Sequence, residues 1–236
     1  MEFDAVVLAG GRSARLGGVP KARLTVDGGT LLSRSLQAAR GARRTVVVGP
    51  DPGDFPPDVL SCREDPPFGG PAAAIAAGLS ALAAVGRGEP TAAGAASLTL
   101  VLACDMPRVA DAVRALLDAL ADVLANAPGD AAAGTVDGFV AVSADGRLQP
   151  LVGLYGTAAL ERAVADAARR NALEGGSVFS LLASLELRQV PVPEGSTDDV
   201  DTWDDASAMG VSTPGPGQSG ALGPNSTLEA NGEEPG

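Results

Sequence analysis

The sequence predicts an α/β protein of three layers, α/β/α, with a Rossmann-like and mostly parallel sheet. Two observations support this fold class. Short, largely apolar runs at residues 3–8, 45–48 and 98–103 suit strands that are covered on both faces. Each run is followed by a loop and then by an Ala/Leu-rich helical segment, which is the order of a parallel sheet with crossover helices. A chain of 236 residues is long enough for one such domain.

Turn residues and hydrophobic periodicity divide the first half of the chain. The turn Asp27-Gly28-Gly29 separates an extended segment from a helix that Thr30 can cap, and Pro71 suits the first turn of a later helix. Residues 50–58 form a loop, and the Gly/Ala-rich residues 86–97 are expected to be mobile. The expected elements are strands at 3–8, 45–48, 59–62 and 98–103, an extended segment at 22–26, and helices at 30–40 and 71–85.

The second half continues the alternation and ends in a different composition. We expect helices at 109–125, 157–170, 177–184 and 200–209, and strands at 131–134, 139–142, 151–155 and 187–192. From Val211 onward the chain is rich in Gly, Pro and Ser, with three glutamates and no basic residue. This composition predicts one domain over residues 1–210 and a disordered acidic tail over 211–236.

Composition excludes several classes of function. A net charge of −12 argues against nucleic acid or an anionic membrane as a partner. The absence of histidine excludes Ser-His-Asp and Cys-His catalysis and histidine-bound zinc. Cys62 and Cys104 form no disulfide framework, which suits free thiols in a cytoplasmic protein. We expect neither a signal peptide nor a membrane span, because the N-terminus is acidic and no apolar run is long enough.

The most informative segment is the loop after the first strand, which contains Gly10, Gly11, Arg12, Arg15 and Lys21. Glycines let the backbone approach an anion, and their N–H groups can point at phosphate oxygens. The three basic residues supply positive charge where a triphosphate is negative. The pattern is neither G-x-G-x-x-G nor a P-loop. A phosphate site is therefore favoured over a simple turn.

Two further loops are expected at the same edge of the sheet. One begins at Glu64-Asp65, and the other begins at Asp105, directly after the strand at 98–103. Asp105 suits a magnesium ligand, although a cap or turn before Pro107 is an equal alternative. A later acidic stretch, residues 198–202, either caps the last helix through Asp201 or Thr202 or contributes a metal ligand.

These motifs together resemble the molybdenum cofactor guanylyltransferases, members of the MobA-like nucleotidyltransferase superfamily. The segment Leu8-Ala9-Gly10-Gly11-Arg12-Ser13-Ala14-Arg15-Leu16-Gly17, followed by Lys21, is similar to the opening signature of the family. The weaker elements follow in family order over residues 3–209: Gly70 to Leu79, Cys104-Asp105-Met106-Pro107, Gln149-Pro150-Leu151 and Asp199-Val200-Asp201-Thr202.

The resemblance implies a nucleotidyltransferase fold and a set of site residues. Lys21 would hold the phosphates, Asp105 would contact the nucleotide and bind Mg²⁺, and Asp201 would assist with the metal. Arg15, Lys21 and Asp105 are the expected catalytic residues. A pterin acceptor would lie near residues 149–155. The implied nucleotide-binding residues are Leu8, Ala9, Gly10, Gly11, Lys21, Gly49, Asp65 and Asp105.

The implied reaction is Mg²⁺-dependent transfer of GMP from GTP to the phosphate of molybdopterin, with release of pyrophosphate. Alanines at Ala72 and Ala74 depart from the family pattern and leave the choice of guanine open. One alternative is a related transferase that uses CTP or another nucleotide and a different phosphorylated acceptor. Another is a nucleotide-binding module without turnover. The resemblance also allows a molybdoenzyme or chaperone as a protein partner, and a monomer or weak oligomer.

Overall fold

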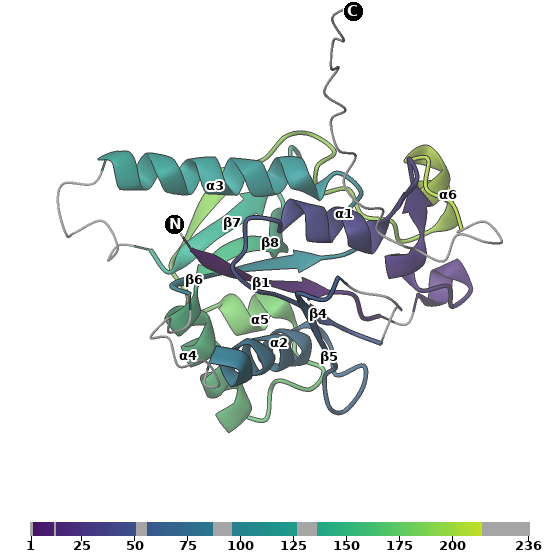
Figure 1. The fold of residues 1–236 in the computed structure, drawn as a ribbon. Helices are drawn as coiled ribbons and strands as arrows, with labels where there is room; N and C mark the ends of the chain where they lie inside the picture. Colours follow the sequence, from purple (N-terminus) through teal and green to yellow (C-terminus); the bar gives the residue numbers. More distant parts are fainter. Residues whose placement is uncertain (1, 12, 51–55, 87–95, 127–135, 214–236) are drawn as a thin grey trace, which may run out of the picture.

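A seven-stranded sheet forms the middle layer of the molecule (Figure 1). The computed structural model describes residues 2–11, 13–50, 56–86, 96–126 and 136–213. The strand order is β5-β4-β1-β6-β8-β7-β9, and only β8 runs antiparallel to its neighbours. The predicted mostly parallel sheet is therefore confirmed. The strands are β1 (Phe3–Leu8), β4 (Thr45–Val48), β5 (Val59–Cys62), β6 (Leu98–Ala103), β7 (Gly138–Val142), β8 (Leu148–Gly156) and β9 (Leu187–Pro191).

Helices cover both faces of this sheet, as predicted for three layers (Figure 1). One face carries α1 (Leu31–Ala38) and α3 (Val109–Asn126). The other face carries α2 (Pro71–Gly86), α4 (Thr157–Arg169) and α5 (Val178–Leu182). Thr30 caps α1 by accepting a hydrogen bond of 3.0 Å from the backbone N–H of Ser33, and Pro71 is the first residue of α2. Both helix starts follow the sequence prediction.

The central strand β1 is buried on both faces, which explains its apolar sequence. Ala5 packs into a cluster under α3 that includes Leu102 and Leu116. Val6 and Leu8 pack into the cluster on the opposite face, with Ile75 of α2. Strands covered on both sides leave no polar face, so their alternation disappears from the sequence.

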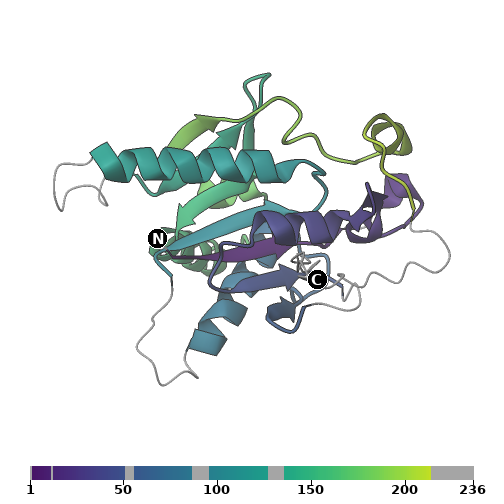
Figure 2. The ribbon, with the colours of Figure 1, turned by 45° about the horizontal axis from the view of Figure 1, so that its top comes forward.

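A third, smaller apolar cluster beside the sheet joins residues 16–31 to residues 200–211. It combines Leu16 and Leu24 from the N-terminal loop with Val200 and with Ala206 of α6 (Trp203–Ala208). Figure 2 shows α6 next to this loop, which contains the short antiparallel pair β2 (Thr25–Val26) and β3 (Gly29–Thr30). The cluster fixes the position of the acidic segment that precedes α6.

The first residues of the expected tail contact the domain. Val211 is buried in the third cluster, and the backbones of Thr25 and Ser212 exchange two hydrogen bonds of 2.8 Å. Residues 211–213 therefore pack against the domain instead of belonging to a tail. The contact was not predictable from the local sequence, because the neighbouring composition is rich in Gly, Pro and Ser and the paired residues are 187 positions apart. The remaining residues of the expected tail, 214–236, lie outside the described residues.

Other predicted elements differ in detail. Residues 21–23 form a 3-10 turn before β2, where an extended segment was expected, and β8 begins at Leu148 instead of Leu151. The expected strand at 131–134 and most of the expected mobile segment at 86–97 lie outside the described residues. Both cysteines are free thiols, as predicted. Among the described helices, none combines the length and apolar character that crossing a membrane requires.

The contact between α2 and β1 provides a test of the packing. A Cβ atom at Gly78 would lie 2.6 Å from Cγ1 of Val6 and 3.1 Å from Cγ2 of Val48. We therefore expect Gly78→Ala to lower the free energy of unfolding by about 1–2 kcal/mol, because overpacking outweighs the gain in helix propensity. Urea unfolding measures this. Ser80→Ala, on the exposed side of the same helix, is the control. A Gly78→Ala variant as stable as the wild type would contradict this packing.

Candidate active site

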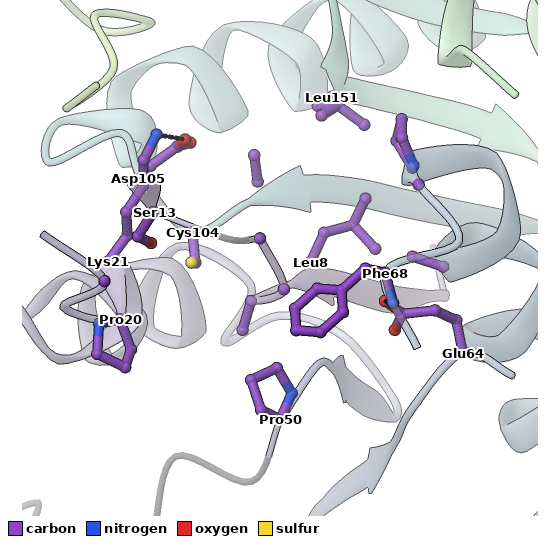
Figure 3. A pocket seen from close by; sticks show the side chains of 18 residues that line it. Leu8, Ser13, Pro20, Lys21, Pro50, Glu64, Phe68, Cys104, Asp105 and Leu151 are labelled. Atoms are coloured by element: carbon purple, nitrogen blue, oxygen red, sulfur yellow. Dashed lines mark hydrogen bonds and ion pairs between the residues drawn. The ribbon is translucent and has the colours of Figure 1, made fainter. Parts of the chain in front are cut away.

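A cleft of about 810 Å³ lies at the carboxyl ends of β1 and β6. Most of its walls come from three segments: the loop after β1, the loop between β5 and α2, and the end of β6, while Pro50 after β4 and Leu151 of β8 complete the lining. This is the edge at which ligands bind in open parallel sheets. Figure 3 shows the side chains that line it. The lining residues are Leu8, Ala9, Gly10, Gly11, Ser13, Gly18, Pro20, Lys21, Pro50, Glu64, Phe68, Gly70, Pro71, Ala74, Ala103, Cys104, Asp105 and Leu151.

One end of the cleft is charged. The Nζ atom of Lys21 lies 2.8 Å from Oδ2 of Asp105 and 2.5 Å from Oδ1 of Asp201 (Figure 3 shows the pair with Asp105). Arg15 lies 3.7 Å from the other oxygen of Asp201 and is largely exposed. The structure thus brings together the four charged residues that the sequence analysis selected from three distant segments.

The fold of the acidic segment explains how Asp201 reaches Lys21. The backbone N–H of Val200 donates a hydrogen bond of 3.0 Å to the carbonyl of Asp105, which ties the two acidic loops together. Thr202 caps α6 and forms a capping box with Asp205. The sequence left open whether Asp201 or Thr202 caps the helix, and the structure shows that Thr202 does. The side chain of Asp201 is directed to Lys21.

A third carboxylate belongs to the same group. Asp105, Asp199 and Asp201 each offer an oxygen atom, and these atoms lie within 4.8 Å of one another. Three carboxylate oxygens are a suitable donor set for a hard divalent cation such as Mg²⁺. Asp199 and its neighbour Asp198 are identical in type, so the sequence does not indicate which of the two joins this group.

The close charges shift the pKa values of two residues of this group. Burial alone would lower the pKa of Lys21, but the charges and hydrogen bonds of Asp105 and Asp201 outweigh it and raise that pKa. Partial desolvation, together with the charges of Asp105 and Asp201, raises the pKa of Asp199. Lys21 is therefore firmly held as an ammonium ion beside the carboxylates.

The other end of the cleft contains a carboxylate with a free oxygen. Glu64 is 7% exposed, and its Oε1 accepts a hydrogen bond of 3.0 Å from the backbone N–H of Phe68. Its Oε2 is buried and accepts no hydrogen bond from any residue that the structure describes. The predicted residue Asp65 is exposed and does not line the cleft. Sequence alone did not distinguish these two adjacent acids.

The glycines and small residues of the first loop line the cleft as expected, from Leu8 through Gly11. Gly49 has another role, since it does not line the cleft. A Cβ atom there would lie 2.8 Å from the carbonyl carbon of Ala9 and 2.8 Å from the nitrogen of Gly10. Gly49 therefore permits the loop after β4 to pack directly behind the loop after β1.

The segment expected near an acceptor, residues 149–155, contributes one lining residue. Leu151 lies at the cleft, on the far side from Pro50 (Figure 3). Tyr155 is fully buried, and its hydroxyl group donates a hydrogen bond of 2.7 Å to the carbonyl of Pro150. Tyr155 thus supports the strand from behind the site.

A nucleotide-sized cleft with a lysine and carboxylates at the carboxyl edge of a mostly parallel sheet is the arrangement of a nucleotidyltransferase. The comparison with protein families agrees. The chain belongs to the MobA-like NTP transferase domain family, whose model matches residues 5–187. No curated protein sequence matches the chain.

Solved structures of known proteins share the fold. A molybdopterin-guanine dinucleotide biosynthesis protein A from Archaeoglobus fulgidus matches with a TM-score of 0.59 at 19% identity, covering 87% of this chain and 96% of that chain. Rv0371c from Mycobacterium tuberculosis matches with a TM-score of 0.60 at 22% identity, covering 89% and 98%. A 2-C-methyl-D-erythritol 4-phosphate cytidylyltransferase from Thermus thermophilus matches with a TM-score of 0.57 at 21% identity, covering 89% and 98%.

The position of Lys21 predicts a competition between its ammonium group and a metal ion. In nucleotide-free protein, the Nζ atom lies between two of the carboxylates that would bind the cation. We expect Lys21→Met to raise the affinity for Mn²⁺ by about tenfold or more, because a positive charge at contact distance is removed. Titration followed by electron paramagnetic resonance measures this. The control is Arg23→Met, an exposed cation of the same loop. Equal Mn²⁺ affinity in wild type and Lys21→Met would refute the competition.

Proposed function

We propose that this protein transfers GMP from GTP to the phosphate of molybdopterin and releases pyrophosphate. The proposal rests on one observation, which is that the two ends of the cleft differ in charge and in hydrogen-bonding groups. Lys21 and the carboxylate group suit a metal-bound triphosphate, and the free oxygen of Glu64 suits the base. The sequence resemblance to the guanylyltransferases supports the same substrate, and the Archaeoglobus protein shares the fold.

Glu64 favours guanine over the other bases for a chemical reason. An ionised carboxylate only accepts hydrogen bonds. On its pairing edge guanine offers two adjacent donors, the N1–H and the 2-amino group, whereas adenine, cytosine and uracil have no two adjacent donors there. Oε1 retains accepting capacity beyond its bond to Phe68, and Oε2 is unpaired. Glu64 can therefore accept both donors of guanine once Oε2, which is buried in the nucleotide-free protein, turns toward the base.

The expected chemistry needs no general base, which agrees with a chain that has no histidine. The nucleophile is a phosphate oxygen that is already anionic at neutral pH. It attacks the α-phosphorus of GTP as the bond to the pyrophosphate oxygen breaks. Lys21 and Arg15 would stabilise the charge that develops on the leaving group. Asp105, Asp199 and Asp201 would hold Mg²⁺, which neutralises phosphate charge when bound.

Asp105 is the carboxylate that tests this site most directly, because it contacts Lys21 and lines the cleft. We expect Asp105→Ala to reduce turnover by about 10²-fold or more, the scale of removing one electrostatic contributor. Pyrophosphate release measures the rate. Asp198→Ala, an exposed neighbour of the acidic group, should keep wild-type turnover. Full activity of Asp105→Ala would remove this residue from the mechanism.

The choice of base has its own test. Inosine triphosphate lacks only the 2-amino group of GTP, so a carboxylate partner should bind it less tightly. We expect the wild type to prefer GTP over inosine triphosphate by about tenfold, the scale of one hydrogen bond to a charged group. Glu64→Gln should abolish this preference, and Asp65→Asn should retain it. Calorimetric titration measures each affinity. A preference that survives Glu64→Gln would exclude this contact.

The reaction itself is tested by incubating the protein with Mg²⁺, molybdopterin and each of GTP, CTP, ATP and UTP. Mass analysis identifies the product. We expect the GMP adduct of molybdopterin from GTP alone. A CMP adduct would favour the cytidylyltransferase alternative. Binding of nucleotide without any adduct would favour another acceptor or a module without turnover.

A further inference from the structure

Phe68 is the one aromatic side chain that lines the described cleft. The whole chain has only five Phe, one Tyr and one Trp. Phe68 is 48% exposed, whereas Leu8 and Ala74, which also line the cleft, are buried. Figure 3 shows its ring between Leu8 and Pro50, next to Glu64. A large apolar ring half exposed in a cleft wall offers a flat surface to a ligand.

The backbone of Phe68 adopts a conformation that its side chain disfavours. Its φ angle is +65°, in the left-handed region, where bulky residues are rare. Such a conformation costs about 1–3 kcal/mol and persists only where the surroundings enforce it. The hydrogen bond from Phe68 N–H to Oε1 of Glu64 supplies part of this support. A glycine would adopt this conformation without a steric penalty, as the two residues that follow, Gly69 and Gly70, could. The presence of a bulky ring at position 68 is therefore not explained by the backbone conformation of the loop.

Two neighbouring side chains position the ring. The guanidinium carbon of Arg63 lies over the ring at 5.3 Å from its centroid, within the range of a cation–π contact. Glu64 links the loop backbone to the cleft, because one of its oxygens binds Phe68 N–H and the other is unpaired. The ring and the free carboxylate oxygen therefore belong to one unit, the Glu64–Phe68 unit.

We propose that Phe68 is the surface on which the base of a purine nucleotide stacks, while Glu64 bonds the edge of that base. This inference rests on the proposed function only in taking a nucleotide as the ligand. It fixes the orientation of that nucleotide in the cleft. The base lies at the Glu64–Phe68 unit, and the phosphates extend to Lys21 and Asp105. Stacking on one aromatic ring contributes about 1–3 kcal/mol per base, so Phe68 is a specificity-determining residue for large bases.

The test separates base binding from phosphate binding with two probes, GTP and inorganic tripolyphosphate, both with Mg²⁺. Calorimetric titration gives each affinity for the wild type, Phe68→Ala, Phe68→Leu and Phe68→Tyr. We expect Phe68→Ala and Phe68→Leu to weaken GTP binding by about tenfold and to leave tripolyphosphate binding unchanged. Phe68→Tyr keeps the ring and should bind GTP as the wild type does. The control is Phe179→Ala, an exposed phenylalanine of α5 that does not line the cleft.

A spectroscopic probe reports stacking itself. The fluorescence of 2-aminopurine riboside triphosphate is quenched when its base stacks on an aromatic ring, so the wild type and Phe68→Tyr should quench it and Phe68→Leu should not. Thermal unfolding of each variant shows whether it is folded. Unchanged GTP affinity in folded Phe68→Leu, or an equal loss for GTP and tripolyphosphate, would overturn the proposal. Stacking that depends on Phe68 in a protein that makes no GMP adduct would uphold this inference and reject the proposed reaction.

Discussion

The ion pairs of Lys21 with Asp105 and Asp201 are the interaction on which the site depends. They join the loop after β1, the loop after β6 and the segment before α6, which are 84 and 180 residues apart in the two pairs. Three carboxylates and two cations, Lys21 and Arg15, lie together at one end of the cleft. The three carboxylates can attract a divalent cation, and the two cationic side chains can attract phosphate groups. Arranging these charges in advance is how a protein can transfer a nucleotide without a histidine base.

The opposite end of the cleft has a different set of side chains. It combines an aromatic ring, Pro50, a glutamate with one unpaired oxygen, and the small residues of the first loop. Such a surface suits a flat base with hydrogen-bond donors, whereas the Lys21 end suits a polyanion. The small side chain of Ala9 and the absence of side chains at Gly10 and Gly49 allow the loop after β4 to pack closely against the loop after β1. The division of the cleft thus follows from a few residues in adjacent loops.

Much of the fold was predictable because its signals are local. The buried strands β1, β4 and β6, the cap at Thr30 and the proline at the start of α2 all depend on short sequence patterns. The extent of β8 and the packing of Val211 were missed, because both depend on distant partners, Thr25 in the latter case. A composition rich in Gly, Pro and Ser predicts disorder, but it does not show whether a single apolar residue such as Val211 packs into the domain.

The site was predictable where residue type and strand position coincided. Lys21 and Asp105 follow strands at the correct edge, and Asp201 precedes a helix in an acidic stretch. Glu64 and Asp65 are adjacent acids, and only the course of the backbone decides which one lies in the cleft wall. Phe68 carries no signal in sequence, since one phenylalanine in a loop is usually a packing residue. Its exposure and its positive φ angle distinguish it only in three dimensions.

We propose that one cleft binds a whole nucleotide in a single orientation. A crystal structure of the protein with Mn²⁺ and a non-hydrolysable GTP analogue, with anomalous scattering to locate the metal, tests it most directly. We expect a Mn²⁺ peak at the oxygens of Asp105 and Asp201, with the guanine against Phe68 and Glu64. A metal away from these aspartates, or a base at the Lys21 end of the cleft, would contradict it.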